Sequence, residues 1–131
     1  RLIPNYREVE EAFFKDTNIF PIMHIIAIRR DIYEANPWVA MNLYKAFIKA
    51  KDNSVRRSLE ITATRYPFAW CYDSADKPKE IFGWDSFPYG LEPNRPTIEA
   101  FLKYAYDQGI CHREVTPEEL FPPEISKVFK V

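Results

Sequence analysis

The strongest constraint on this 131-residue chain is a ten-residue apolar run rich in isoleucine, Ile19-Phe-Pro-Ile-Met-His-Ile-Ile-Ala-Ile28, which Arg29 and Arg30 follow. Its length, its β-branched residues and the proline near its start favour a strand buried on both faces of a sheet. A strand cannot satisfy its backbone alone, so its partners must be the irregular segments, another copy of the chain or residues upstream. We favour residues upstream, which predicts that the chain is part of a larger α/β protein.

The rest of the chain predicts mostly helices. Apolar periodicity indicates helices at residues 5–17, from 36 to between 58 and 61, at 79–82 and at 96–108, with a helical turn starting near residue 31. Thr116-Pro-Glu-Glu119 has the form of a capping box and predicts a short tail helix. Between residues 64 and 93 the periodicity largely fails. Long aromatic loops of this kind are more often functional or interface-forming than idle.

Composition excludes several classes of function. The formal net charge of −1 argues against a general nucleic-acid binder, and no apolar run reaches the roughly 20 residues of a membrane helix. The three glycines, Gly83, Gly90 and Gly109, cannot form a known phosphate-binding loop or a nucleophile elbow. Cys71 and Cys111 lack the spacing of a zinc or redox motif, so we expect two partly buried thiols and no metal.

The N-terminus reads Arg1-Leu-Ile-Pro4, which is neither an initiator methionine nor a signal peptide. It looks like a cut edge, upstream of which a targeting segment would be invisible. We therefore expect a cytoplasmic location, or a periplasmic one if a signal peptide precedes Arg1.

Two regions carry residues that suit chemistry. His24 interrupts the apolar run and could transfer protons, although a hydrogen-bonded core histidine is the more common case. Arg29, Arg30 and Arg95 could bind carboxylates, although arginines at a strand end are usually solvated, and nearby acids can neutralise them. The segment 82–95 places polar side chains among aromatic ones, which suits either an aromatic ligand or a packed Ω-loop. Its polar and tyrosine residues are Asp85, Tyr89, Glu92, Asn94 and Arg95.

Several long motifs together resemble the 4,5-dihydroxyphthalate decarboxylase family. They are Thr17-Asn-Ile-Phe-Pro-Ile-Met-His24, Ile28-Arg-Arg-Asp-Ile-Tyr-Glu-Ala-Asn-Pro-Trp38, Asp85-Ser-Phe-Pro-Tyr-Gly-Leu-Glu-Pro-Asn-Arg95, Leu102 with Gln108-Gly109, and Thr116-Pro-Glu-Glu-Leu-Phe121. The resemblance covers nearly the whole chain and is weakest from residue 51 to 81.

The resemblance implies an α/β fold like that of type II periplasmic substrate-binding proteins, with two lobes around a cleft. Because members of the family are much longer, residues 1–131 would form the helix-rich C-terminal part. Residues 1–30 would then hold the end of the second lobe and a crossing strand. Residues 31–131 would return to the first lobe, mostly as helices.

The resemblance also implies a decarboxylase that needs no cofactor and converts 4,5-dihydroxyphthalate to protocatechuate and CO₂. By residue type and motif position, His24 would donate a proton or hydrogen-bond a catechol, and Asp85 would polarise a phenol. The substrate-binding residues would be Arg95 as a carboxylate clamp, Tyr89 and Trp84 as walls, and Asn94. The alternative is a solute-binding protein that delivers a small anionic or aromatic compound to an importer.

The expected partner is thus a small anionic aromatic substrate, without nucleic acid or membrane insertion. The missing N-terminal part of the same fold, or a second copy of the chain, would cover the exposed strand edges.

Overall fold

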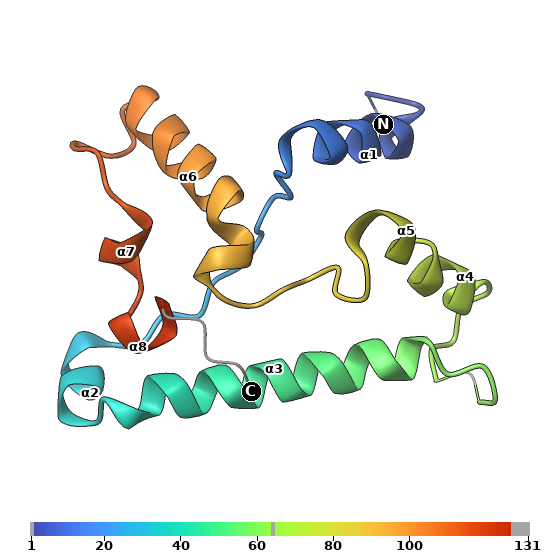
Figure 1. Cartoon of the computed structure of the whole chain (residues 1–131), viewed down its shortest axis with the longest axis horizontal. Coiled ribbons are helices and arrows are strands. Elements are labelled where there is room, and N and C mark those ends of the chain that lie inside the picture. The colour runs from blue at the N-terminus through green and yellow to red at the C-terminus, as the bar shows by residue number, and fades with distance from the viewer. Residues whose placement is uncertain (1, 64, 127–131) are drawn as a thin grey trace. The chain divides into compact units, whose positions relative to one another are not determined.

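The computed structural model describes residues 2–63 and 65–126, and these residues form eight helices and no strand (Figure 1). The helices are α1 (Tyr6–Thr17), α2 (Arg30–Ala35), α3 (Trp38–Ser58), α4 (Cys71–Asp76), α5 (Lys79–Phe82), α6 (Leu91–Asp107), α7 (Pro117–Leu120) and α8 (Pro123–Ser126).

The predicted α/β class, with its periplasmic-binding-protein-like two-lobe architecture, is therefore wrong for this chain. The apolar run at residues 19–28 has neither helical nor strand structure and links α1 to α2 (Figure 1). The physical reason is that a strand exists only when a neighbouring strand takes up its backbone hydrogen bonds. Within residues 2–63 and 65–126, no other segment supplies those hydrogen bonds.

The first predicted helix is confirmed as α1. Its apolar face comes from Tyr6, Val9 and Phe13, which recur at helical spacing. Asn18 ends the helix in the left-handed conformation, with φ 55°, and its N–H donates to the carbonyl of Phe14 at 2.8 Å. Asparagine tolerates this conformation better than most residues with a Cβ atom, which explains why the helix stops here.

The long helix expected after Asn36-Pro37 is confirmed as α3, and the short helix at residues 79–82 is confirmed as α5. The capping box is also present: the side chain of Glu119 accepts the N–H of Thr116 at 2.8 Å. Helix α4 was not predicted, because its six residues are too few to show a helical period.

Helix α6 begins at Leu91, five residues before the predicted start at Pro96. Pro93 is the third residue of the helix, where a missing N–H costs nothing because the first-turn donors have no helical acceptor. Pro96 lies farther inside the helix and removes one backbone hydrogen bond. Gly90 precedes the helix with φ 112° and ψ 164°, a conformation essentially restricted to glycine.

The chain divides into two compact units, which we call the first unit, Arg1–Ala40 with Tyr89–Val131, and the second unit, Met41–Pro88. The described core of the first unit is a small cluster in which Leu91, Ile98 and Leu102 of α6 are at most 8% exposed. Val115 and Phe121 pack against it from the segments flanking α7. Burying a leucine side chain stabilises a fold by roughly 1.5–3 kcal/mol, so this cluster is the main apolar support of α6 and α7.

Two hydrogen bonds connect distant parts of the first unit. The N–H of Phe20 donates to the buried hydroxyl of Thr97 at 3.0 Å, which attaches the start of the apolar run to α6. The hydroxyl of Tyr33 donates to Glu124 at 2.9 Å and so connects α2 with α8. Acceptance of that hydrogen bond by Glu124 raises the pKa of Tyr33.

No helix in the described part of the chain has both the length and the apolar character needed to cross a bilayer.

Candidate functional site

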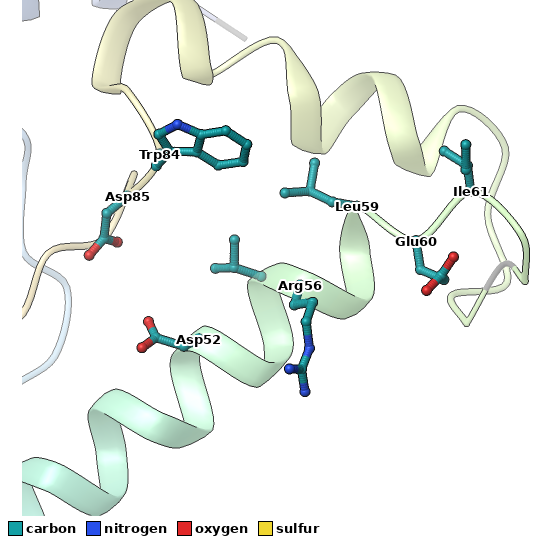
Figure 2. Close-up of a pocket in the computed structure, with 8 residues that line it drawn as sticks. Asp52, Arg56, Leu59, Glu60, Ile61, Trp84 and Asp85 are labelled. Atoms are coloured by element: carbon teal, nitrogen blue, oxygen red, sulfur yellow. The ribbon is translucent and has the colours of Figure 1, made fainter.

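A pocket of about 470 Å³ lies in the second unit, between the C-terminal half of α3 and the segment after α5 (Figure 2). Its volume falls within the range of small-molecule sites, about 300–1,000 Å³. The residues that line it are Asp52, Val55, Arg56, Leu59, Glu60, Ile61, Trp84 and Asp85. The sequence predicted functional roles for Trp84 and Asp85, and the structure places both at this pocket.

The pocket has an apolar interior wall. Val55 lies on α3 and Leu59 directly follows the helix, where its N–H donates to the carbonyl of Val55 at 3.2 Å, so the two side chains lie on the same side of its last turn. The indole of Trp84 lies across from this side in Figure 2, and 79% of the residue is exposed. The ammonium of Lys79 lies 4.4 Å from the centroid of the Trp84 ring, a cation–π contact that helps to hold the indole in place.

One end of the pocket is an ion-pair cluster around Lys51, whose side chain is only 12% exposed. The ammonium of Lys51 binds the carboxylate of Asp85, and it lies 3.1 Å from that of Asp52. The other oxygen of Asp85 accepts the N–H of Phe87 at 3.1 Å, an Asx-type turn that orients the carboxylate. Asp85 is therefore positioned from two directions.

Lys51 remains a cation in this setting. Burial acts to lower its pKa, but the hydrogen bonds to Asp85 and Asp52 outweigh burial, and the pKa is raised. Burial has the opposite effect on the nearby Tyr44 and raises its pKa, and the positive charge of Lys51 lowers that pKa by a smaller amount. The cluster thus holds a fixed positive charge next to Asp85.

The remaining charged groups of the pocket are Arg56 and Glu60. Arg56 donates to the side-chain oxygen of Asn53 at 2.9 Å, and its guanidinium points away from the indole in Figure 2. Glu60 accepts hydrogen bonds from the hydroxyl and the N–H of Thr62 at 2.6 and 3.1 Å.

The charged side chains in and next to the pocket are three carboxylates and two cations, if Lys51 is included. They are those of Asp52, Glu60, Asp85, Arg56 and Lys51. The arrangement can hold a flat aromatic ring against an apolar wall, and it offers a carboxylate as an acceptor for a hydroxyl group. Because Lys51 is already paired, a ligand carboxylate would have to be neutralised by Arg56.

The predicted carboxylate clamp, Arg95, lies in the first unit and binds three glutamates. It is 2.6 Å from Glu92, 3.3 Å from Glu99 and 2.6 Å from Glu118 of α7. The hydrogen bonds to the three glutamates raise the pKa of Arg95, and the bond to Glu92 has the largest effect. In return, the hydrogen bonds from Arg95 lower the pKa of Glu92 and of Glu118. The guanidinium therefore connects α6 with α7, and its role as a substrate clamp stays a prediction.

We expect Arg95→Gln to lower the melting temperature at neutral pH by more than Lys103→Gln, which removes a single exposed ion pair. Because the pKa values of Glu92 and Glu118 are depressed in the fold, their contribution is present above the usual pKa of glutamate and is lost as the pH falls through the depressed values. The difference between wild type and Arg95→Gln should thus vanish in acid. Melting curves across this pH range measure it, and a difference that persists unchanged in acid would contradict the assignment.

The other predicted site residues also lie in the first unit. The side-chain amide of Asn94 donates to the carbonyl of Gly90 at 2.8 Å, across the first turn of α6. Tyr89 and His24 are exposed, and His24 makes no polar contact with any described residue. Their roles as substrate wall and proton donor stay predictions.

Sequence reasoning missed the contribution of α3 to the pocket. Asp52, Val55 and Arg56 of α3 and Leu59 just after it recur at i, i+3, i+4 and i+7, the spacing of one helical face. That mixture of two charged and two apolar residues was the available signal. The carboxylate partner of Lys51 had no such signal, because Asp85 is 34 residues away in the sequence.

Metal-binding groups are not assembled in the part of the chain that the structure describes: no three His, Cys, Asp or Glu residues there could hold an ion together. Cys71 is buried, Cys111 is partly buried, and both are free thiols. Arg29 binds Asp31, as the alternative reading of that arginine expects, with Nε donating at 3.0 Å.

No protein-family model matches the chain. It is similar to a 4,5-dihydroxyphthalate decarboxylase from Comamonas testosteroni, with 29% identity over 130 residues. The match covers 99% of this chain and 39% of that protein, so the chain spans less than half the length of its relative. The relative carries the name of the family that the sequence motifs resemble, and the identity is that of a distant relative.

Proposed function

We propose that this protein takes part in the non-oxidative decarboxylation of a hydroxylated aromatic dicarboxylate, with 4,5-dihydroxyphthalate as the substrate. The observation that carries the proposal is the similarity, over 130 residues, to a protein named 4,5-dihydroxyphthalate decarboxylase. The pocket of the second unit supplies a physical reason, because it joins an aromatic wall with a held carboxylate.

The proposed reaction needs electron density at the ring carbon that bears the departing carboxylate. A phenol hydroxyl para to that carbon gives its proton to a base, and the oxygen electrons move into the ring. The ring carbon that bears the carboxylate then takes a proton, its bond to the carboxylate breaks, and the electron pair of that bond restores the aromatic ring with the phenolate, which takes its proton back from the base. One proton is consumed and one CO₂ leaves, so no oxidant or reductant is required.

We assign the phenol acceptor to Asp85, because Lys51 and the N–H of Phe87 hold its carboxylate in position. A fixed acceptor avoids the cost of orienting a base during the reaction. Trp84 would stack on the substrate ring, and Val55 with Leu59 would exclude water from its other side.

Arg56 would neutralise a substrate carboxylate from the rim of the pocket. Its guanidinium carries one hydrogen bond, to Asn53, on a long side chain that can turn toward the pocket. Arg57, the next residue, lines a different hollow with Arg65 and Tyr66 and provides a matched control for charge removal.

Release of CO₂ from 4,5-dihydroxyphthalate is the test, with the Comamonas testosteroni relative as positive control. We expect turnover, with Arg56→Gln raising KM at least about tenfold, as loss of a charge-assisted hydrogen bond predicts, and Arg57→Gln leaving KM unchanged. Binding of the same compound, followed by calorimetry, separates the alternatives. Binding without turnover would replace the enzyme by a solute-binding protein, and the absence of both would refute the proposal.

A further inference from the structure

Two carboxylates of the pocket in the second unit share one cation. The ammonium of Lys51 binds Asp85 and lies 3.1 Å from Asp52, so it holds both carboxylates at the same end of the pocket. Two oxygens that bond one nitrogen are at most two hydrogen-bond lengths apart, roughly 6 Å. Figure 2 shows both carboxylates on the same side of the pocket, one from α3 and one from the segment after α5. The pocket therefore presents a pair of neighbouring anionic acceptors.

These two acceptors have capacity that the fold does not use. A carboxylate can accept about four hydrogen bonds. Within the part of the chain that the structure describes, the carboxylate of Asp52 has Lys51 as its only polar partner, and 62% of the side chain is exposed. Asp85 accepts from Lys51 and from the N–H of Phe87. Because one ammonium cannot neutralise two carboxylates, a ligand at this end of the pocket must bring hydrogen-bond donors and keep its own carboxylate away.

The place for a ligand carboxylate lies about one helical turn farther along α3. Arg56 follows Asp52 by four residues, a rise of roughly 6 Å along the helix axis. Between the two ends, Val55 and the indole of Trp84 provide apolar surface for a flat ring. A ring with an anion on one edge and two adjacent hydroxyls on the opposite edge matches this order. Each hydroxyl needs an acceptor about 2.7 Å away, and the paired carboxylates supply two.

We propose that Asp52 accepts the second hydroxyl of an ortho-dihydroxy aromatic acid, next to the hydroxyl that Asp85 accepts. The inference rests on the proposed function, in which Asp85 is the phenol acceptor. Asp52 takes no part in proton transfer and instead determines which substrates bind. A ligand with a single hydroxyl would cover Asp52 and displace its water without giving it a new donor, and sites built to bond a hydroxyl reject analogues that lack it.

Two ligands that differ in one hydroxyl test this role. 3,4-Dihydroxybenzoate and 4-hydroxybenzoate share the ring, the carboxylate and the hydroxyl para to it. In titration calorimetry, wild type should bind the dihydroxy compound at least about tenfold more tightly, as expected for one hydrogen bond to a charged group. Asp52→Ala should remove this preference by weakening the binding of the dihydroxy compound alone. Asp73→Ala, on α4 and outside the pocket lining, should retain the preference of wild type.

Turnover of 4,5-dihydroxyphthalate separates recognition from chemistry. Asp52→Ala should raise KM at least about tenfold with little change in kcat, which is the reverse of the result expected for a group that takes the proton. The variant should keep the helical circular dichroism of wild type, because the Asp52 side chain is exposed and Lys51 is still bound by Asp85.

Three results would each overturn the role of Asp52: no preference in wild type, a preference that survives Asp52→Ala, or equal weakening of both ligands by Asp52→Ala. Failure of the proposed function gives a different result. A preference that depends on Asp52 without any release of CO₂ would refute the decarboxylase and support the recognition of the second hydroxyl. Release of CO₂ with an unchanged KM in Asp52→Ala would support the decarboxylase and refute the role of Asp52.

Discussion

Replacing Leu102 by Ala is expected to lower the free energy of unfolding of the first unit by about 2–5 kcal/mol, the usual cost of a leucine removed from a core. Leu102 is 8% exposed and packs with Leu91 and Ile98 of the same helix. Because the described core is so small, neither of these neighbours can fill the resulting cavity without leaving other contacts. The expected observation is a lower midpoint of urea denaturation, followed by circular dichroism at the helical band.

Leu120→Ala is the matched control, because Leu120 ends α7 with 51% of its surface exposed. Surface substitutions of this kind usually change stability by no more than about 0.5 kcal/mol. Equal destabilisation by the two variants would show that the cluster around Leu102 does not support the first unit.

Removing the charge of Asp85 is expected to have the largest effect on turnover. Asp85→Asn keeps an oxygen that can accept the N–H of Phe87, so the turn after α5 should survive. It loses the carboxylate that would take the phenol proton, and general-base catalysis contributes about 10²–10⁴-fold. We expect kcat to fall by roughly 10²-fold or more in the CO₂-release assay, with little change in KM.

Asp73→Asn makes the same substitution on α4, in the same unit but outside the pocket lining. It should retain wild-type turnover. An Asp85→Asn variant with normal kcat would remove Asp85 from the reaction, and one that also loses its helical signal would point instead to a structural role of the bond to Lys51.

Most helices could be predicted from sequence because their information is local. Apolar spacing identified α1 and α3, and the pair Thr116 and Glu119 identified the start of α7. The start of α6 was wrong because Pro96 fits the first position of a helix as well as the interior position that it occupies. Local sequence did not distinguish the two.

The apolar run from Ile19 to Ile28 illustrates the limit of local information. Its composition is that of a buried strand, yet the described residues contain no second strand for it to join. Whether such a segment forms a strand depends on groups elsewhere, and for this reason the predicted fold class was wrong while the helical predictions were mostly confirmed.

The candidate site was partly predictable for a similar reason. Trp84 and Asp85 stood out because the aromatic segment around them has no periodic role. The sequence does not distinguish Lys51 from the other lysines of α3, and only the fold shows its ammonium bound to Asp85.

The exposure of the tryptophans determines how this protein can be followed by fluorescence. All three indoles are in contact with water, since Trp38, Trp70 and Trp84 are 61%, 77% and 79% exposed. Their emission in the native state should already resemble that of the unfolded chain, so denaturation will produce little spectral shift. An aromatic compound that stacks on Trp84 would instead displace water from one indole, and a blue shift or quenching on titration would report occupancy of the pocket directly.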